Sequence, residues 1–91
     1  MPVISREAVI LNMRGLHARA SAQLVKTCQE FDAEICVSKD GTQVSGLSIM
    51  GLMMLAAGPG SVVGVKAKGD DAEAAVDAVC ALITNLFGED S

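Results

Sequence analysis

The stretch EICVSKDGTQVS, residues 34–45, gives the clearest indication of the fold. Asp40-Gly41 at its centre is the strongest short-range signal for a β-hairpin, because both central residues of the favoured turn need a positive φ. We therefore expect two antiparallel strands, Glu34 to Lys39 and Thr42 to Ser45. The remaining elements have to extend this hairpin into a sheet and bury its apolar side.

Before the hairpin, the sequence predicts one strand and one helix. The strand runs from Val3 to Asn12, is partly β-branched, and is followed by a loop at Arg14-Gly15. From Ala18 onward the small and apolar residues follow i, i+3, i+4, i+7 spacing, which is typical of an amphipathic helix. We place the N-terminus of this helix at His17. Its inner face is formed by Ser21, Leu24, Val25 and Cys28.

After the hairpin, the sequence predicts a helix, a strand and a last helix. The first helix covers Ser48 to Ala57, with Ser48 as its N-cap, and ends before Gly58-Pro59-Gly60. Apolar residues then alternate from Val63 to Ala67, as in a strand with one buried face. The last helix has an acidic first turn at Asp70-Asp71 and an apolar stripe that reaches Phe87.

The resulting order is β-α-β-β-α-β-α, in a single domain of 91 residues. Three amphipathic helices need one apolar sheet face to cover, so the fold class is α+β, an open sandwich of helices on a four-stranded sheet. The core has to come from aliphatic side chains and methionine, because the chain holds two phenylalanines and no tryptophan or tyrosine. Such a core leaves little room for an enclosed ligand cavity.

Composition argues against several classes of protein. Seven basic and eleven acidic residues give a net charge of −4, which is the wrong sign for a nucleic-acid binder. The longest nearly uncharged stretch, Val44 to Val65, is broken by glycines and Pro59, so we expect no insertion into a membrane. The N-terminus has no pattern of a signal peptide. Three cysteines, Cys28, Cys36 and Cys80, have no metal-ligand spacing, and we interpret them as reduced core residues of a cytoplasmic protein.

His17 is the one histidine of the chain, and two interpretations of it are open. A neutral imidazole is a nucleophile that can accept a phosphoryl group, and the predicted helix N-terminus would offer that anion the N–H groups of Ala18 to Ser21. Arg19 would add charge-assisted hydrogen bonds. The plainer interpretation is that His17 caps or flanks the helix and Arg19 is a solvated charge. Spacing alone favours the plainer one, because a single H-x-R is a weak motif.

Two longer segments resemble a known family. RGLHARASAQLV, residues 14–25, is similar to the active-site segment of HPr, the histidine-containing phosphocarrier of the bacterial phosphoenolpyruvate-dependent phosphotransferase system. SIMGLMMLAAGPG, residues 48–60, is similar to that family's second signature. The separation of the two segments and the order of elements also match. The resemblance implies the family's open-faced β-sandwich, in which three helices cover one face of a four-stranded antiparallel sheet.

The resemblance also implies a function and its residues. His17 matches the histidine that phosphorylated enzyme I modifies on Nδ1, and Arg19 the arginine beside the phosphoryl group. Gly15 matches the glycine that lets the loop approach the site. The phosphoryl group would pass to IIA-type components of a sugar or a nitrogen-related branch, so the chain would be a stoichiometric carrier and not an enzyme. It would need no cofactor or metal, and we expect a monomer.

This chain departs from the family pattern at two positions. Ala20 stands where many members carry proline, a residue that suits a first helical turn because it needs no N–H donor there. Alanine keeps the helix and restores a donor, so we expect function to survive. Arg14 stands where enteric members carry asparagine, and an added cation should favour a bound phosphoryl group while altering the preference for partners.

The predicted second helix suggests a docking surface and a switch. Its apolar residues wrap more than one face, so some have to be exposed. They either fill gaps in a small core or form a contact patch, for which we select Ile49, Met50 and Met53 together with Arg14. Ser48 is an ordinary N-cap or, by resemblance, a regulatory site for a serine kinase/phosphorylase. The alternative function is a small regulatory module that binds proteins through this methionine-rich helix without phosphoryl transfer.

Overall fold

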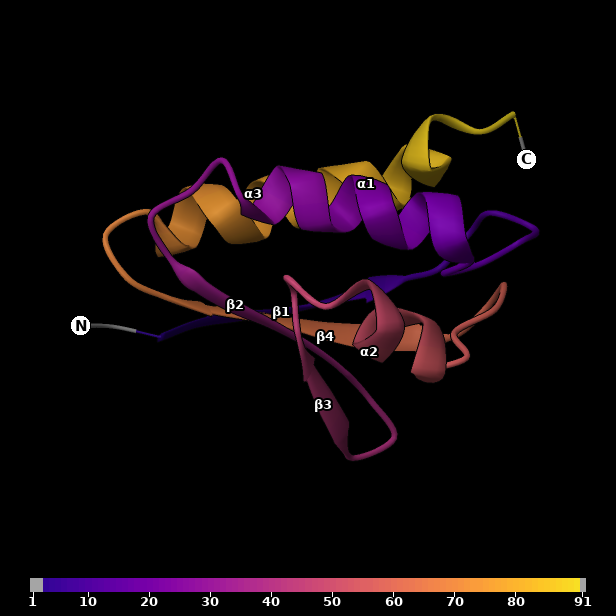
Figure 1. Cartoon of the computed structure of the whole chain (residues 1–91), viewed down its shortest axis with the longest axis horizontal. Coiled ribbons are helices and arrows are strands. Elements are labelled where there is room, and N and C mark those ends of the chain that lie inside the picture. The colour runs from indigo at the N-terminus through magenta and orange to yellow at the C-terminus, as the bar shows by residue number, and fades with distance from the viewer. Residues whose placement is uncertain (1–2, 91) are drawn as a thin grey trace.

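The computed structural model describes residues 3–90 and has an α+β fold with helices on one side of a sheet (Figure 1). The sheet strands are β1 (Val3–Val9), β2 (Glu34–Lys39), β3 (Thr42–Ser45) and β4 (Val62–Lys68). The helices are α1 (Ala18–Cys28), α2 (Ile49–Met54) and α3 (Ala72–Thr84), followed by the 3-10 turn η1 (Leu86–Gly88). The predicted element order is confirmed, with η1 as an addition after the last helix.

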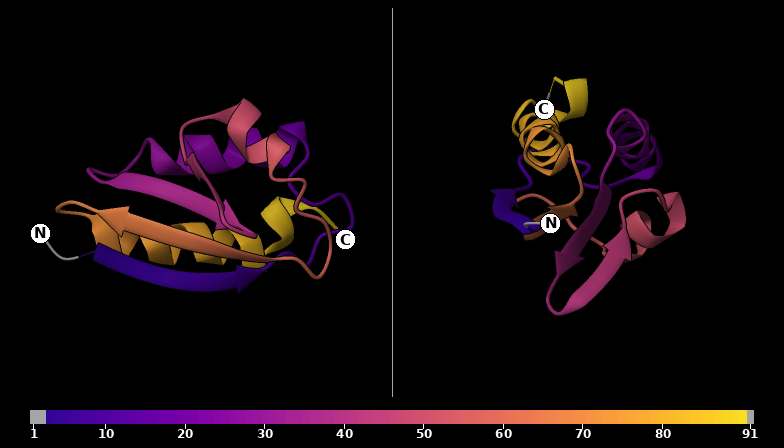
Figure 2. Two further views of the ribbon diagram at one scale, coloured as in Figure 1. Left: turned by 90° about the horizontal axis from the view of Figure 1, so that it is seen from below. Right: turned by 90° about the vertical axis from the view of Figure 1, so that its left-hand side faces the viewer.

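The sheet has the order β1-β4-β2-β3, and all three pairings are antiparallel. The hairpin forms as predicted, with Asp40 and Gly41 at φ of 52° and 85°. Strand β4 lies between β1 and β2, so it joins the start of the chain to the hairpin. Figure 2 shows that the opposite face of the sheet carries no helix, which confirms the open-faced arrangement.

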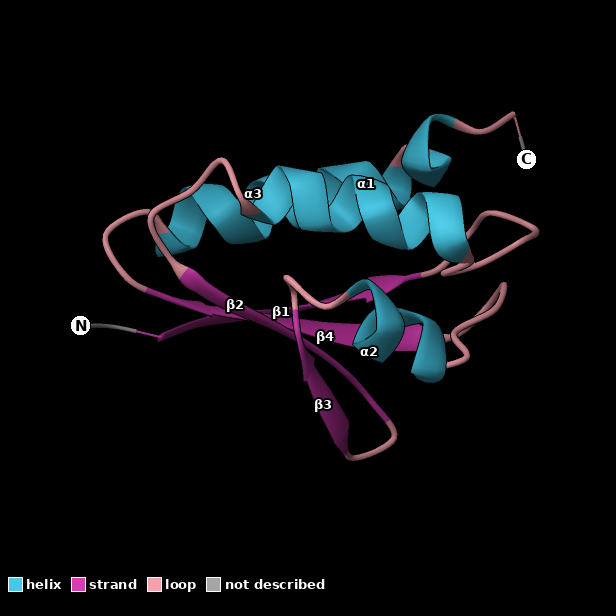
Figure 3. Ribbon diagram, in the orientation of Figure 1, coloured by secondary structure: helices cyan, strands magenta, loops and turns pink. Residues whose placement is uncertain are grey.

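The core lies between the sheet and the helices and forms one cluster of buried apolar residues. Helix α3 packs on β1 and β4, while α1 packs between α3 and α2. The face of α1 that the sequence predicted to be buried is confirmed, including Ser21, which has no exposed surface. Figure 3 shows the long α1 and α3 over the sheet and the short α2 beside the N-terminal half of α1.

Several elements end earlier than predicted. Strand β1 ends at Val9 and not Asn12, because its partner β4 begins at Val62 and the ladder between the two strands ends there. Helix α2 ends at Met54 and not Ala57, because Ala56 adopts a left-handed conformation (φ 53°) that no α-helix can continue.

The end of the last helix is the largest difference from the prediction. Helix α3 stops at Thr84, and Leu86 and Phe87 are both left-handed, with φ of 60° and 54°. Consecutive left-handed residues with side chains are costly, and here they turn the chain so that Phe87 is buried with 1 % exposure. The apolar stripe therefore continues to Phe87 as predicted, but the helix does not.

The cysteines are free, and they differ in their surroundings. Cys28 is buried in the core, and burial raises the pKa of its thiol to about 11. Cys80 is partly buried and packs against the core, whereas Cys36 lies on β2 next to Lys66 of β4. The prediction of a core position is therefore wrong for Cys36, because its strand position faces the uncovered side of the sheet.

The fold predicts that Leu52 anchors α2, because it is the one fully buried residue of this short helix. Leu52→Ala should lower the free energy of unfolding by about 2–5 kcal/mol, measured by urea denaturation. The matched control is Met54→Ala on the same helix, where 78 % of the residue is exposed and the change should stay within about 0.5 kcal/mol. Equal effects of the two substitutions would contradict this packing.

Candidate functional site

His17 lies at the N-cap position of α1, where the sequence analysis placed it. Its backbone is extended (φ −72°, ψ 179°), and its side chain makes no capping hydrogen bond with the helix. About 17 % of the side chain is exposed. The ring therefore does not act as the cap that the plainer interpretation proposed, and it is held by other contacts.

The first turn of α1 offers backbone N–H groups beside His17. An α-helix leaves its first N–H groups without intrahelical acceptors, and here these belong to Ala18, Arg19 and Ala20. Ser21 differs, because its N–H already donates to the His17 carbonyl at 2.9 Å. The Ser21 N–H, predicted as a phosphoryl-binding donor, is therefore not a free donor in this structure. Its hydroxyl instead donates to the Leu16 carbonyl at 3.1 Å and holds the preceding loop.

The loop before His17 is fixed against the segment that follows α2. The Leu16 N–H donates to the Ala57 carbonyl at 3.0 Å. Gly15 is left-handed (φ 60°), and a Cβ atom at this position would collide with the same carbonyl oxygen. Only glycine allows this approach without a shift of the backbone. The close approach expected for Gly15 is thus confirmed.

Glu89 is a residue of this site that the sequence analysis missed. Its carboxylate is hydrogen-bonded to Nε2 of His17, and the Asn12 side-chain amide donates to the same carboxylate at 2.8 Å. The hydrogen bond from Asn12 contributes most to lowering the pKa of Glu89, and the one from His17 contributes next. The charge of Arg14 lowers this pKa further. The carboxylate is therefore ionised at neutral pH.

Asn12 is the second missed residue. It is fully buried, and its amide nitrogen also donates to the Gly15 carbonyl at 2.9 Å. Asn12 thus connects the loop before His17 with the C-terminal segment. A polar residue within the apolar run of residues 8–13 was a visible signal for such a role. Glu89 gave no comparable signal, because the turn at Leu86 and Phe87 brings it to the site.

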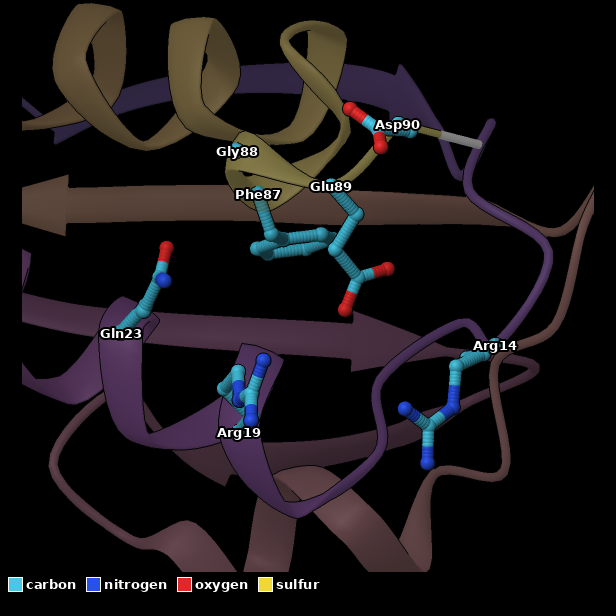
Figure 4. A pocket seen from close by; sticks show the side chains of 7 residues that line it. All are labelled: Arg14, Arg19, Gln23, Phe87, Gly88, Glu89 and Asp90. Carbon is cyan, nitrogen blue, oxygen red and sulfur yellow. The ribbon is translucent and has the colours of Figure 1, made fainter.

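Arg14, Arg19 and Glu89 border one open pocket of about 380 Å³. Its other lining residues are Gln23 of α1 and Phe87, Gly88 and Asp90 of the C-terminal segment. In Figure 4 the Glu89 carboxylate extends from that segment into the space between the two arginines, which lie on the opposite side. The lining thus combines two arginines with two carboxylates, and it is too polar for an apolar ligand.

Ser48 caps α2, as the sequence predicted. Its hydroxyl oxygen accepts a hydrogen bond from the Gly51 N–H at 2.9 Å. The residues that follow are exposed at the surface of α2, as the wrapping of apolar residues required. The exposed fractions are 40 % for Ile49, 71 % for Met50, 41 % for Met53 and 78 % for Met54.

The described residues show neither a metal-binding cluster nor a membrane-spanning helix. Across residues 3–90, no three His, Cys, Asp or Glu side chains are grouped so that they could hold a metal ion. No helix in the same range is long and apolar enough to cross a membrane.

Comparisons with known proteins assign this fold, with its lone imidazole at a helix N-terminus, to one family of small carrier proteins. The family model "PTS HPr component phosphorylation site" matches residues 4–85. The phosphocarrier protein HPr of Cupriavidus necator is 48 % identical over 87 residues, which are 96 % of this chain and 98 % of that protein. The phosphocarrier protein NPr of Shewanella violacea is 43 % identical over the full length of both chains.

A solved structure shows the same relationship in three dimensions. The crystal structure of HPr-C-His from Thermoanaerobacter tengcongensis superposes with a TM-score of 0.88 at 42 % identity, with full coverage of both chains. The chain belongs to the HPr family of the phosphotransferase system. It is accordingly a phosphocarrier and not an enzyme.

The contact of Gly15 with Ala57 yields a prediction for stability. Gly15→Ala forces a side chain into the left-handed region and against the Ala57 carbonyl, so the free energy of unfolding should fall by more than about 1 kcal/mol. Urea denaturation measures this loss. Gly58→Ala is the matched control, since a Cβ there meets no atom within 4 Å and its φ is not positive. A wild-type stability of Gly15→Ala would contradict the described loop packing.

Proposed function

We propose that His17 accepts a phosphoryl group from phosphorylated enzyme I and passes it to IIA-type components of the phosphotransferase system. The observation that carries the proposal is the position of the chain's one imidazole. It lies at the N-terminus of α1, and its ring makes no capping hydrogen bond with the helix. Membership of the HPr family supports the carrier role. In this proposal the chain acts as a cytoplasmic monomer and needs no cofactor.

The surroundings of His17 favour a transferable phosphoryl group. The N–H groups of Ala18, Arg19 and Ala20 and the positive end of the α1 dipole can meet its oxygens, and the Arg19 guanidinium can add charge-assisted hydrogen bonds. The dipole contributes only about 0.3–1 kcal/mol. Stabilisation of that size holds the group between encounters and still allows its release. Arg14, which borders the same pocket, adds a second cation.

The exposed side of α2 is the proposed docking surface for both donor and acceptor. It consists of Ile49, Met50 and Met53, with Arg14 as a charged contact nearer to His17. Helix α2 packs against α1, so this surface lies on the helix adjoining the one that carries the site. Methionine side chains adapt to different partners. A carrier needs this property because it has to bind its donor and its acceptors in turn.

The proposal is tested by incubation with phosphoenolpyruvate and enzyme I, followed by intact mass measurement at neutral and acid pH. We expect one phosphoryl group that is lost in acid, and none on His17→Ala, because a phosphoramidate at His17 is the only adduct that the proposal allows. Subsequent addition of IIA proteins of the sugar and nitrogen-related branches should remove the group and identify the branch.

An adduct that persists in His17→Ala would contradict the proposal, as would a wild-type chain that stays unmodified. If such an unmodified chain still bound its partners through α2, it would instead be a regulatory protein-binding module.

We also propose that Ser48 is a regulatory phosphorylation site for a serine kinase/phosphorylase. A phosphate on its hydroxyl would remain at the N-terminus of α2, where the fold tolerates it, but would place nearly two negative charges beside Ile49 and Met50. A partner that buries those residues would have to desolvate this charge. Docking should therefore weaken while the fold is preserved.

Ser48→Asp should reproduce part of this effect. Asp is a good N-cap, so stability should change by less than about 1 kcal/mol, whereas phosphoryl transfer from enzyme I should require about tenfold more carrier for the same rate. Ser5→Asp on the uncovered side of the sheet, opposite Lys66, is the control with the same added charge. Identical transfer kinetics for the two variants would contradict a regulatory role of Ser48.

A further inference from the structure

The hydrogen bond between Glu89 and the His17 ring has a chemical consequence that rests on the proposed phosphoryl transfer at His17. Glu89 comes from the segment after η1, far from His17 in sequence, and about 16 % of its side chain is exposed. Asn12, which is fully buried, fixes the other carboxylate oxygen at 2.8 Å from its amide nitrogen. The carboxylate is thus held from two sides.

An ionised carboxylate only accepts hydrogen bonds. The ring nitrogen that faces it, Nε2, has to be the donor and therefore carries the proton of the neutral imidazole. The lone pair is then on Nδ1, and the ring makes no capping hydrogen bond with α1 that would occupy this nitrogen. The same rule holds for histidines in other sites: the hydrogen-bond partner of one ring nitrogen fixes the tautomer, and the tautomer decides whether the other nitrogen has a free lone pair.

We propose that Glu89 is the positioning residue of the phosphocarrier site: it fixes the His17 proton on Nε2 and so makes Nδ1 the nucleophile. Asn12 supports it by holding the carboxylate. The proposal concerns the orientation and protonation of the ring and does not require Glu89 to contact the phosphoryl group.

The transfer step balances with the proton kept in place. The Nδ1 lone pair forms a bond to phosphorus, the bond between phosphorus and the donor atom breaks, and its electron pair leaves with the donor. The ring gains a positive charge, which the Glu89 carboxylate stabilises at Nε2. In the onward step a nucleophilic atom of the acceptor protein forms a bond to phosphorus, the Nδ1–phosphorus bond breaks, and its electron pair returns to the ring. The neutral Nε2–H form is restored for the next cycle.

The charges around the site are consistent with a proton held at Nε2 and a phosphoryl group bound at Nδ1. Glu89 meets the ring at Nε2, on the side away from the proposed phosphoryl position. Arg14 and Arg19 border the same pocket and offset the presence of two anions, and the charge of Arg14 contributes to lowering the pKa of Glu89. Asp90 is the other carboxyl group that lines the pocket.

Glu89→Gln tests the proposal, because glutamine has nearly the same shape but can either donate or accept at Nε2. Nitrogen NMR of the neutral His17 ring, recorded for the unphosphorylated protein, measures which nitrogen carries the proton. We expect almost only the Nε2–H form in the wild type and a mixture in Glu89→Gln. The rate of phosphorylation by enzyme I should fall about tenfold in the variant.

Glu30→Gln is the matched control. It makes the same exchange just beyond the C-terminal end of α1, opposite the end that carries His17, and should match the wild type in both measurements. The proposal is overturned if the wild-type proton lies on Nδ1, if Glu89→Gln leaves the proton distribution unchanged, or if the distribution changes without slowing phosphorylation. A wild-type chain that enzyme I does not phosphorylate would instead contradict the proposed function, whatever the position of the proton.

Discussion

The pairing of β4 with β1 on one side and β2 on the other is the constraint on which the rest of the structure depends. The ladder ends at Val9 and Val62, and Ile10 still exchanges hydrogen bonds of 2.8 Å with Gly60 and Ser61 beyond it. The loop after β1 therefore lies against the segment after α2. Gly15 and Leu16 contact Ala57 for this reason, and His17 begins α1 from a fixed starting point.

The elements that follow local rules were predictable from the sequence. The Asp40-Gly41 turn needs positive φ at both residues, and the inner face of α1 follows helical spacing, so both were confirmed. The presence of Ser48 as an N-cap followed from the preference of serine for that position. Each of these features depends on residues that are neighbours in the sequence.

The parts of the site that the sequence did not reveal depend on contacts between distant segments. The apolar spacing that continues to Phe87 is compatible both with a longer helix and with the turn that is observed. It could therefore not indicate that Leu86 and Phe87 are left-handed. That turn is stabilised by burial of Phe87 and brings Glu89 to His17. The roles of Asn12 and Glu89 follow only once the two ends of the chain are placed together.

A phosphocarrier has to hold its group firmly enough to travel and loosely enough to release it. The site proposed here would meet this requirement with weak contributions from several groups, namely backbone N–H groups of α1, the two arginines and an imidazole hydrogen-bonded to a carboxylate. In the proposed function, docking is separated from this chemistry and assigned to α2, where exposed methionines can adapt to more than one partner. On that proposal, a change at Ser48 would alter docking without altering the ring.

Phosphorus and nitrogen NMR of the chain after phosphorylation by enzyme I tests the central claim most directly. The account predicts a single phosphohistidine, with phosphorus coupled to Nδ1 of His17 and the ring proton retained on Nε2. Phosphorus bonded to Nε2, or to a residue other than His17, would contradict it.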